Sequence, residues 1–117
     1  MQWKLWLDDL RNPSVEVPDE KDFIWAHDVE QAKYYVKMWG PPFFMDLDHD
    51  LGVSLKSHVI ESNRTETAME FLRWLSDKYF DSGADIQYKV HSANPVGVDN
   101  IIAFMTSWRR NAVAQME

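Results

Sequence analysis

Cysteine is missing from this chain of 117 residues, which excludes a disulfide scaffold, a thiolate zinc site and a cysteine nucleophile. Long apolar runs are missing as well. No stretch approaches the roughly 18 apolar residues that a membrane-spanning helix needs, and the N-terminal apolar run is too short for a secretory signal. We therefore expect a soluble, cytoplasmic protein with no membrane association. The length fits one domain over residues 1–117.

Basic residues are scarce, with 12 lysines and arginines against 19 aspartates and glutamates and a net charge of −7. Because nucleic-acid-binding domains normally carry a basic surface, this balance argues against a protein that grips a long nucleic acid. It leaves room for a single bound phosphate. Five acids lie at the ends of two predicted strands and account for most of the excess negative charge: Asp8, Asp9, Asp46, Asp48 and Asp50.

Short apolar segments alternate along the chain with segments of helical periodicity. Four strands are predicted, at residues 3–7, 23–26, 43–45 and 86–90. The strands are separated by amphipathic helices, which predicts a parallel sheet covered on both faces. Right-handed crossovers favour the strand order 2-1-3-4.

Three helices are predicted from apolar stripes that begin at Val29, Ala68 and Ile101. Asp28 is expected to cap the first helix, and Gly40-Pro41-Pro42 is expected to stop it. Thr67 precedes the second helix and has Glu70 three residues on, which is a capping-box pattern. Residues 53–66, between the third strand and that helix, are predicted to form a loop.

The strand ends carry the first chemical signal. In open α/β sheets, ligands bind outside the carboxyl ends of the strands, at the switch in strand order, which lies here between the first and third strands. Alternate residues of an extended segment point to the same side, so Asp46, Asp48 and Asp50 would repel one another unless a cation lies between them. Oxygen ligands suit Mg²⁺, with Mn²⁺ as the alternative. The competing interpretation is that these acids cap turns or face water.

Two other motifs share parts of this pattern. The D-x-D-x-D run resembles the start of an EF-hand loop, but that loop needs glycine at its sixth position and glutamate at its twelfth. Leu51 and Ser57 stand at those positions. An Asp-x-Asp after an apolar strand also resembles a phosphatase of the aspartyl-phosphate type, which usually carries the motif on the first strand of a longer chain.

Two histidines and a polar loop give the second signal. His49 lies within the acidic segment and His91 ends the fourth strand, so the pair is a candidate acid and base near neutral pH. Neighbouring carboxylates would raise the pKa values of both rings. The alternative is that each ring serves structure only. The loop after His91 offers backbone N–H groups and the side chains of Ser92 and Asn94 to an anion, or merely caps the next helix. Arg11 is either a phosphate clamp or a salt-bridge partner.

Three strings together resemble the cyclic-phosphate processing receiver domain family: LDDLRNP at 7–13, LDHDLG at 47–52 and HSANPVG at 91–97. The resemblance covers nearly the whole chain. It implies a small, three-layer flavodoxin- or receiver-like α/β fold with four parallel strands and about three helices. The predicted site residues that it implies are Asp8, Asp9, Arg11, Asp48, His49, Asp50, Thr67, His91, Ser92 and Asn94.

The chain departs from the family pattern at three places. Ala68 stands where the family tends to have glycine, Asp46 is an extra acid, and the loop at 53–66 is longer than typical. The extra acid would strengthen a cation site. The long loop is expected to act as a lid or a partner surface.

The leading hypothesis is a phosphoesterase that opens a cyclic phosphate on an RNA end or a small cyclic nucleotide. In this hypothesis a divalent cation is bound by Asp8, Asp9 and Asp48. Protons are transferred by His49, His91 and Asp50. The substrate is bound by Arg11, Thr67, Ser92 and Asn94. One alternative is a receiver-like phosphorylation switch, since Lys89 lies two residues before His91. Another is a non-catalytic module that binds a cyclic nucleotide or a protein. A homo-oligomer is left open.

Overall fold

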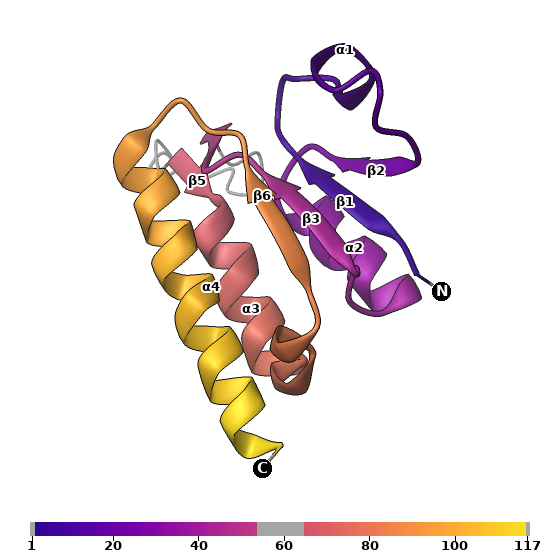
Figure 1. The fold of residues 1–117 in the computed structure, drawn as a ribbon. Helices are drawn as coiled ribbons and strands as arrows, with labels where there is room; N and C mark the ends of the chain where they lie inside the picture. The colour runs from indigo at the N-terminus through magenta and orange to yellow at the C-terminus, as the bar shows by residue number, and fades with distance from the viewer. Residues whose placement is uncertain (1, 54–64, 117) are drawn as a thin grey trace.

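The computed structural model describes residues 2–53 and 65–116. Its centre is a sheet of four parallel strands in the order β2-β1-β3-β6 (Figure 1). The strands are β1 (Lys4–Leu7), β2 (Phe23–Ala26), β3 (Phe44–Leu47) and β6 (Gln87–Val90). Counted along the chain, this is the predicted order 2-1-3-4. The receiver-like α/β fold is therefore confirmed.

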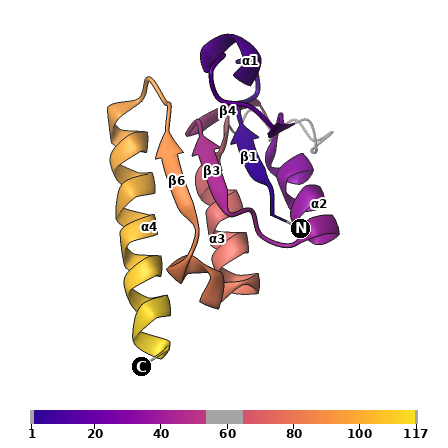
Figure 2. The same cartoon turned by 45° about the vertical axis from the view of Figure 1, so that its right-hand side comes forward.

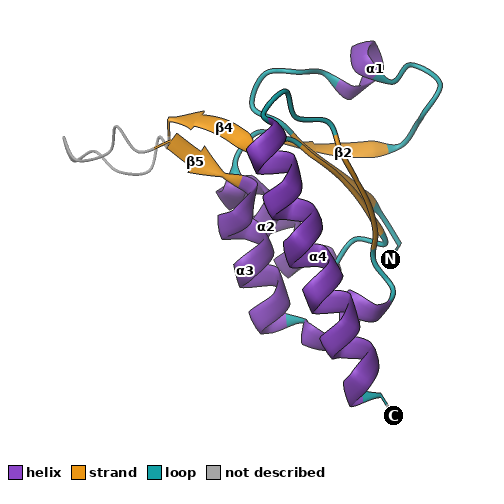
Figure 3. Ribbon diagram, turned by 60° about the vertical axis from the view of Figure 1, so that its left-hand side comes forward, coloured by secondary structure: helices purple, strands orange, loops and turns teal. Residues whose placement is uncertain are grey.

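Three long helices lie together on one face of this sheet (Figure 3). They are α2 (Val29–Trp39), α3 (Ala68–Lys78) and α4 (Pro95–Gln115). Their buried side chains pack with Leu5, Leu7, Met45 and Leu47 of the strands in one hydrophobic core. In α4 this stripe consists of Ile101, Met105, Trp108 and Ala112, as the sequence periodicity predicts. No helix of the described residues is long and apolar enough to cross a bilayer.

The opposite face carries a much thinner layer, which differs from the expectation that helices cover both faces evenly. It holds the single-turn helix α1 (Pro13–Glu16) and the chain around it. From β1 to β2 the chain moves toward one edge of the sheet, whereas the later crossovers move toward the opposite edge. Because crossovers between parallel strands are right-handed, the β1–β2 segment lies on the opposite face. The prolines at 13 and 18 leave room there for only one helical turn.

Trp6 anchors this thin layer to the sheet. Its side chain is 1% exposed, although it points away from the core beneath the long helices. The indole Nε1 donates to the carbonyl oxygen of Arg11 at 2.8 Å. Lys89 on β6 reaches the same layer, where its Nζ lies 3.0 Å from Glu20 Oε1. The segment between β1 and β2 is thus held to the sheet by a few specific polar contacts.

Residues at both ends of the predicted 53–66 loop belong to a small hairpin instead. Strand β4 (Asp50–Val53) pairs antiparallel with β5 (Thr65–Thr67). The buried carboxylate of Glu66 accepts a hydrogen bond from the Val29 N–H at 2.8 Å, which ties the hairpin to the start of α2. Residues 54–64, where a lid or partner surface is expected, lie outside the described residues.

The helix caps follow the sequence at α2 and depart from it at α3. Asp28 accepts from the Gln31 N–H at 2.8 Å, and α2 ends where Gly40 takes a φ of 81°. Thr67 is at the N-cap of α3, but its side chain makes no capping hydrogen bond, so the capping-box prediction is wrong. The first N–H of the helix, at Ala68, donates to the carbonyl oxygen of His49 at 2.9 Å.

After α3, the short 3-10 helix η2 (Phe80–Ala84) leads into β6. It packs against the far end of α4, where Trp108 Nε1 donates to the Phe80 carbonyl oxygen at 2.7 Å. Gly83 is required at this contact, since a Cβ there would lie 2.3 Å from Trp108 Nε1. Because α4 begins a short loop after β6 ends, its N-terminus lies at the edge where β1, β3 and β6 end (Figure 2).

Candidate functional site

A pocket of about 710 Å³ opens at the carboxyl ends of β1 and β3, beside the loop that follows β6. It therefore lies at the switch in strand order, as the topology predicts. Eight of the ten predicted site residues line it: Asp8, Asp9, Arg11, Asp48, Asp50, Thr67, Ser92 and Asn94. The remaining lining residues are Leu10, Gly52 and Ala93. The two predicted histidines lie behind this lining.

Asp8, Asp9 and Asp48, the three predicted metal ligands, lie together. Each offers one carboxylate oxygen, and the three oxygens lie within 4.8 Å of one another. Burial raises the pKa of Asp9, and burial together with the charge of Asp8 raises the pKa of Asp48. Three carboxylate oxygens at this spacing suit a hard divalent cation such as Mg²⁺ or Mn²⁺.

The close approach of β4 to these acids depends on Gly52. Its φ is 74°, a conformation that glycine adopts without steric cost. A Cβ at this position would lie 2.7 Å from Asp9 Oδ2. Gly52, which ends the LDHDLG string, thus lines the pocket beside Asp9.

Asp8 is held more firmly than its neighbours. Its Oδ1 accepts from the backbone N–H groups of Leu10 at 2.8 Å and Arg11 at 2.9 Å. Its backbone oxygen accepts from Trp25 Nε1 at 2.7 Å. The side chain is fully buried. The turn after β1 therefore fixes one carboxylate oxygen of Asp8 in place.

His91 bridges the second oxygen of Asp8 to another buried carboxylate. Its Nε2 lies 2.9 Å from Asp8 Oδ2, and its Nδ1 lies 2.6 Å from Asp46 Oδ1. Each ring nitrogen thus has a carboxylate oxygen as its partner, an arrangement that favours the protonated ring, in which both nitrogens donate. Burial by itself lowers the pKa of His91, but the hydrogen bonds to Asp46 and Asp8 outweigh burial and raise it. The ring stacks on Trp6 with centroids 4.1 Å apart and planes 7° apart.

The alternation of the acidic segment predicts that Asp46 shares the pocket with Asp48 and Asp50, but Asp46 does not line the pocket. It is within β3 and pairs in register with Trp6, so it faces the thinly covered side of the sheet. Only 3% of it is exposed. Its partner is His91, which strand position alone does not reveal. The extra acid of this chain thus lies behind the site rather than within the pocket.

His49 is enclosed between the hairpin and the start of α4. Its Nδ1 lies 2.8 Å from Asp50 Oδ1, and Asp50 Oδ2 accepts from Asn94 Nδ2 at 3.3 Å. The ring packs on the α4 backbone at Gly97, where a Cβ would lie 2.4 Å from His49 Cγ. The Asp50 side chain is 49% exposed, whereas that of His49 is 11% exposed. Asp50 is therefore the member of this pair that faces the pocket.

The predicted anion ligands surround the N-terminus of α4. Asn94 caps that helix by accepting from the Gly97 N–H at 3.1 Å. Ser92 Oγ accepts from the Asn94 N–H at 3.1 Å, and its hydroxyl also hydrogen-bonds Asp48. Arg11 Nη1 donates to the His91 carbonyl oxygen at 3.0 Å, which holds the guanidinium at the pocket rim. A helix N-terminus and a guanidinium both favour a bound anion.

Lys89, the residue on which the receiver-like switch depends, lies elsewhere. Its side chain projects from the thinly covered face, where it pairs with Glu20, and that hydrogen bond raises its pKa. Among the described residues that line the pocket there is no lysine. The side chain beside Asp8 Oδ2 is His91 instead, at 2.9 Å.

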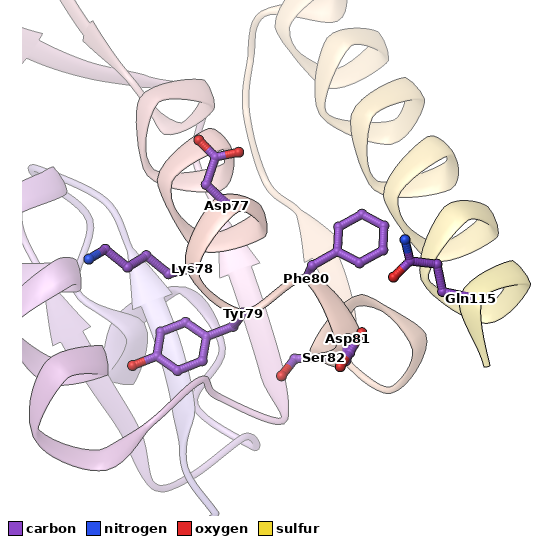
Figure 4. A pocket seen from close by; sticks show the side chains of 7 residues that line it. All are labelled: Asp77, Lys78, Tyr79, Phe80, Asp81, Ser82 and Gln115. Carbon is purple, nitrogen blue, oxygen red and sulfur yellow. The ribbon is translucent and has the colours of Figure 1, made fainter.

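A second pocket, of about 540 Å³, lies at the far end of α3 and α4. Its labelled side chains spread away from the turn between α3 and η2 instead of converging on one point (Figure 4). It holds none of the predicted site residues.

A four-stranded parallel sheet with an acidic pocket at its carboxyl edge defines a receiver-like domain. The model of the cyclic-phosphate processing receiver domain family matches residues 3–107, and the chain belongs to this family. The matched range contains every residue of the pocket. No curated protein and no solved structure matches the chain.

Proposed function

We propose that this protein is a phosphoesterase that opens a cyclic phosphate, on an RNA end or a small cyclic nucleotide, with a divalent cation held by Asp8, Asp9 and Asp48. One observation carries the proposal. The three carboxylates share a pocket with the guanidinium of Arg11 and the N-terminus of α4. Membership of a family named for cyclic-phosphate processing supports the same substrate class.

The donor set fits the proposed cation. All three groups are carboxylates, which Mg²⁺ and Mn²⁺ prefer. The pKa values of Asp9 and Asp48 are raised, so a neighbouring positive charge would stabilise their ionised forms. When bound, such a cation would polarise a phosphate oxygen and lower the pKa of a coordinated water.

The remaining pocket residues bind the phosphate and move protons. Arg11, Thr67 and the first turn of α4 hold the non-bridging oxygens and favour the charge that develops on them. Asp50 takes a proton from the attacking water as the new P–O bond forms. The P–O bond to the ribose oxygen breaks, and that oxygen receives a proton from the His49–Asp50 pair. The product is an acyclic phosphomonoester.

Proton transfer is assigned to the His49–Asp50 pair because Asp50 reaches the pocket. The ring nitrogens of His91 are both occupied by carboxylates. His91 serves as the fixed counter-charge of Asp8.

The pocket volume and the net charge define the substrate further. A volume of about 710 Å³ is within the range for a small-molecule site. With a net charge of −7 the surface disfavours contact with a long phosphate backbone. The substrate is thus a terminal nucleotide or a free cyclic nucleotide.

The test is incubation of the protein with 2′,3′-cyclic nucleotides and with short RNA that ends in a cyclic phosphate. Each reaction is run with Mg²⁺, with Mn²⁺ and with a chelator, and ring opening is followed by phosphorus NMR. We expect turnover that the chelator abolishes. Asp48→Asn should reduce turnover by about a hundredfold or more, whereas Asp81→Asn, an acid at the far end of the molecule, should leave it unchanged.

Three results would overturn this proposal. Folded protein that opens none of these substrates with either metal is the first. Calorimetry that shows tight binding of a cyclic nucleotide without turnover would support a binding module instead. Labelling of an aspartate by acetyl phosphate, with no hydrolysis, would support a phosphorylation switch.

A further inference from the structure

A continuous chain of hydrogen bonds runs behind the acidic pocket, from Asp46 through His91 to Asp8. The two contacts measure 2.6 Å and 2.9 Å. All three groups are largely enclosed: the side chains are 4%, 17% and 1% exposed. They come from the ends of three different strands, β3, β6 and β1. The chain thus connects the three strands whose ends build the pocket.

The middle member of this chain can hold only one ring orientation. Its face stacks on Trp6, which itself is held by a hydrogen bond to the backbone of Arg11. Within the stacking plane, the hydrogen bond to Asp46 fixes the direction of Nδ1 and therefore the direction of Nε2 on the other side of the ring. That nitrogen contacts Asp8 Oδ2.

The two oxygens of Asp8 are fixed by separate means. The turn after β1 supplies the N–H groups that hold Oδ1, whereas His91 is the partner of Oδ2. Because the two oxygens belong to one rigid carboxylate, both sets of contacts act on its orientation, and the contact with His91 is the one that a change at Asp46 can alter. Groups that orient a metal ligand from behind typically change metal affinity by about 10–100-fold when they are removed.

We infer that Asp46 is a positioning residue that acts through His91 to orient Asp8 and so sets the affinity of the pocket for a divalent cation. Asp46 cannot be a ligand itself, because its side chain faces the other side of the sheet and does not line the pocket. The inference rests on the cation site of the proposed function. It gives a role to an acid that the predicted site did not contain.

Calorimetric titration with Mn²⁺, which needs no substrate and no turnover, tests this role. Asp46→Ala should weaken Mn²⁺ binding by about 10–100-fold. Asp46→Asn keeps an acceptor oxygen and the side-chain volume, so its Mn²⁺ affinity should lie closer to that of the wild type. It also keeps the test available if Asp46→Ala fails to fold. Glu66→Gln is the matched control: it also removes a buried charge, but at the α2 cap, and should leave Mn²⁺ binding unchanged.

A double-variant cycle tests the route through His91. In a His91→Gln background, Asp46→Ala should cause little further loss of Mn²⁺ affinity, because the link to Asp8 is already altered. Equal losses of affinity in both backgrounds, or wild-type binding by Asp46→Ala, would overturn the inference alone. Wild-type protein that binds no Mn²⁺ would overturn the cation site of the proposed function and the inference with it.

Discussion

Replacing Gly97 with alanine is the most direct probe of how α4 holds His49. The added Cβ would lie 2.4 Å from His49 Cγ, 2.7 Å from Nδ1 and 2.8 Å from Cβ. Neither the α4 backbone at Gly97 nor the backbone at His49 can move without breaking a hydrogen bond. The Gly97 N–H is bound by the Asn94 cap, and the His49 carbonyl oxygen accepts the first N–H of α3. The clash therefore involves the base of the side chain as well as its ring.

The sign of the change in the free energy of unfolding shows whether helix propensity or the steric clash dominates in Gly97→Ala. Alanine in place of glycine within a helix normally stabilises by up to about 1 kcal/mol. Forcing an extra carbon into a filled site typically costs about 1–3 kcal/mol. We expect the clash to dominate, with a net loss of about 1–2 kcal/mol and a Tm lower by about 4–8 °C. Because His49 must move away from Asp50, turnover should also fall by about tenfold or more.

Urea and thermal unfolding, followed by circular dichroism, measure this change in the wild type and in a His49→Ala background. Without the histidine ring, Gly97→Ala should be neutral or stabilising. Asn100→Ala, at an exposed position of the same helix, controls for helix propensity. A Gly97→Ala variant that is more stable than the wild type, or that loses the same free energy in both backgrounds, would refute the packing argument.

Three further predictions concern buried and crowded carboxylates and the histidine between them. Glu66→Ala removes the acceptor of the Val29 N–H and should lower the free energy of unfolding by about 1–2 kcal/mol in urea titrations, with unchanged Mn²⁺ binding. Because the pKa of His91 is raised in the folded protein, protonation of its ring contributes stability that is fully present below pH 6.5. This contribution is lost as the pH rises through the folded-state pKa. In chelator, the wild type should therefore lose more stability above pH 6.5 than His91→Gln, and parallel curves would contradict this. The raised pKa of Asp48 makes its carboxylate destabilising at neutral pH, so Asp48→Asn should be more stable than the wild type in chelator. The wild type should overtake it when Mg²⁺ is added at a hundredfold excess over Kd, which contributes about 2.7 kcal/mol.

The sequence predicts the cation cluster because local pattern and topology agree there. Asp8 and Asp9 follow an apolar strand, and Asp48 follows another. Since both strands are parallel neighbours in the predicted order, their ends must meet. The structure brings these three acids together at one edge.

The placement of Asp46 is not predictable from alternation. The rule that alternate residues share a side holds only while the strand continues, and β3 ends at Leu47. Asp46 keeps the orientation of the strand toward Trp6, whereas Asp48 lies beyond the strand end and lines the pocket. A buried carboxylate one residue before the end of a strand, with a histidine at the end of the next strand, is the signal that would find such a pair.

Long-range caps lie outside what local patterns reveal. Thr67 has the capping-box sequence and stands at the N-cap of α3, yet its side chain makes no capping hydrogen bond. Glu66 caps α2 from 37 residues away along the chain, a contact that only the assembled fold creates. Asn94, by contrast, caps the helix that directly follows it, and its position before a proline is a local signal.

The thin layer over the second face of the sheet divides the pocket into parts of unequal local stability. The acids of the pocket follow strands packed under three long helices, whereas Arg11 leads into a segment whose helix buries only Pro13. Segments with few buried contacts open at a free energy below that of global unfolding. Residues 12–22 should therefore exchange their amide hydrogens faster than the core strands. Opening of this segment would release Arg11 from a bound phosphate while the carboxylates stay in place, which in the proposed reaction would let the product leave without dismantling the rest of the pocket.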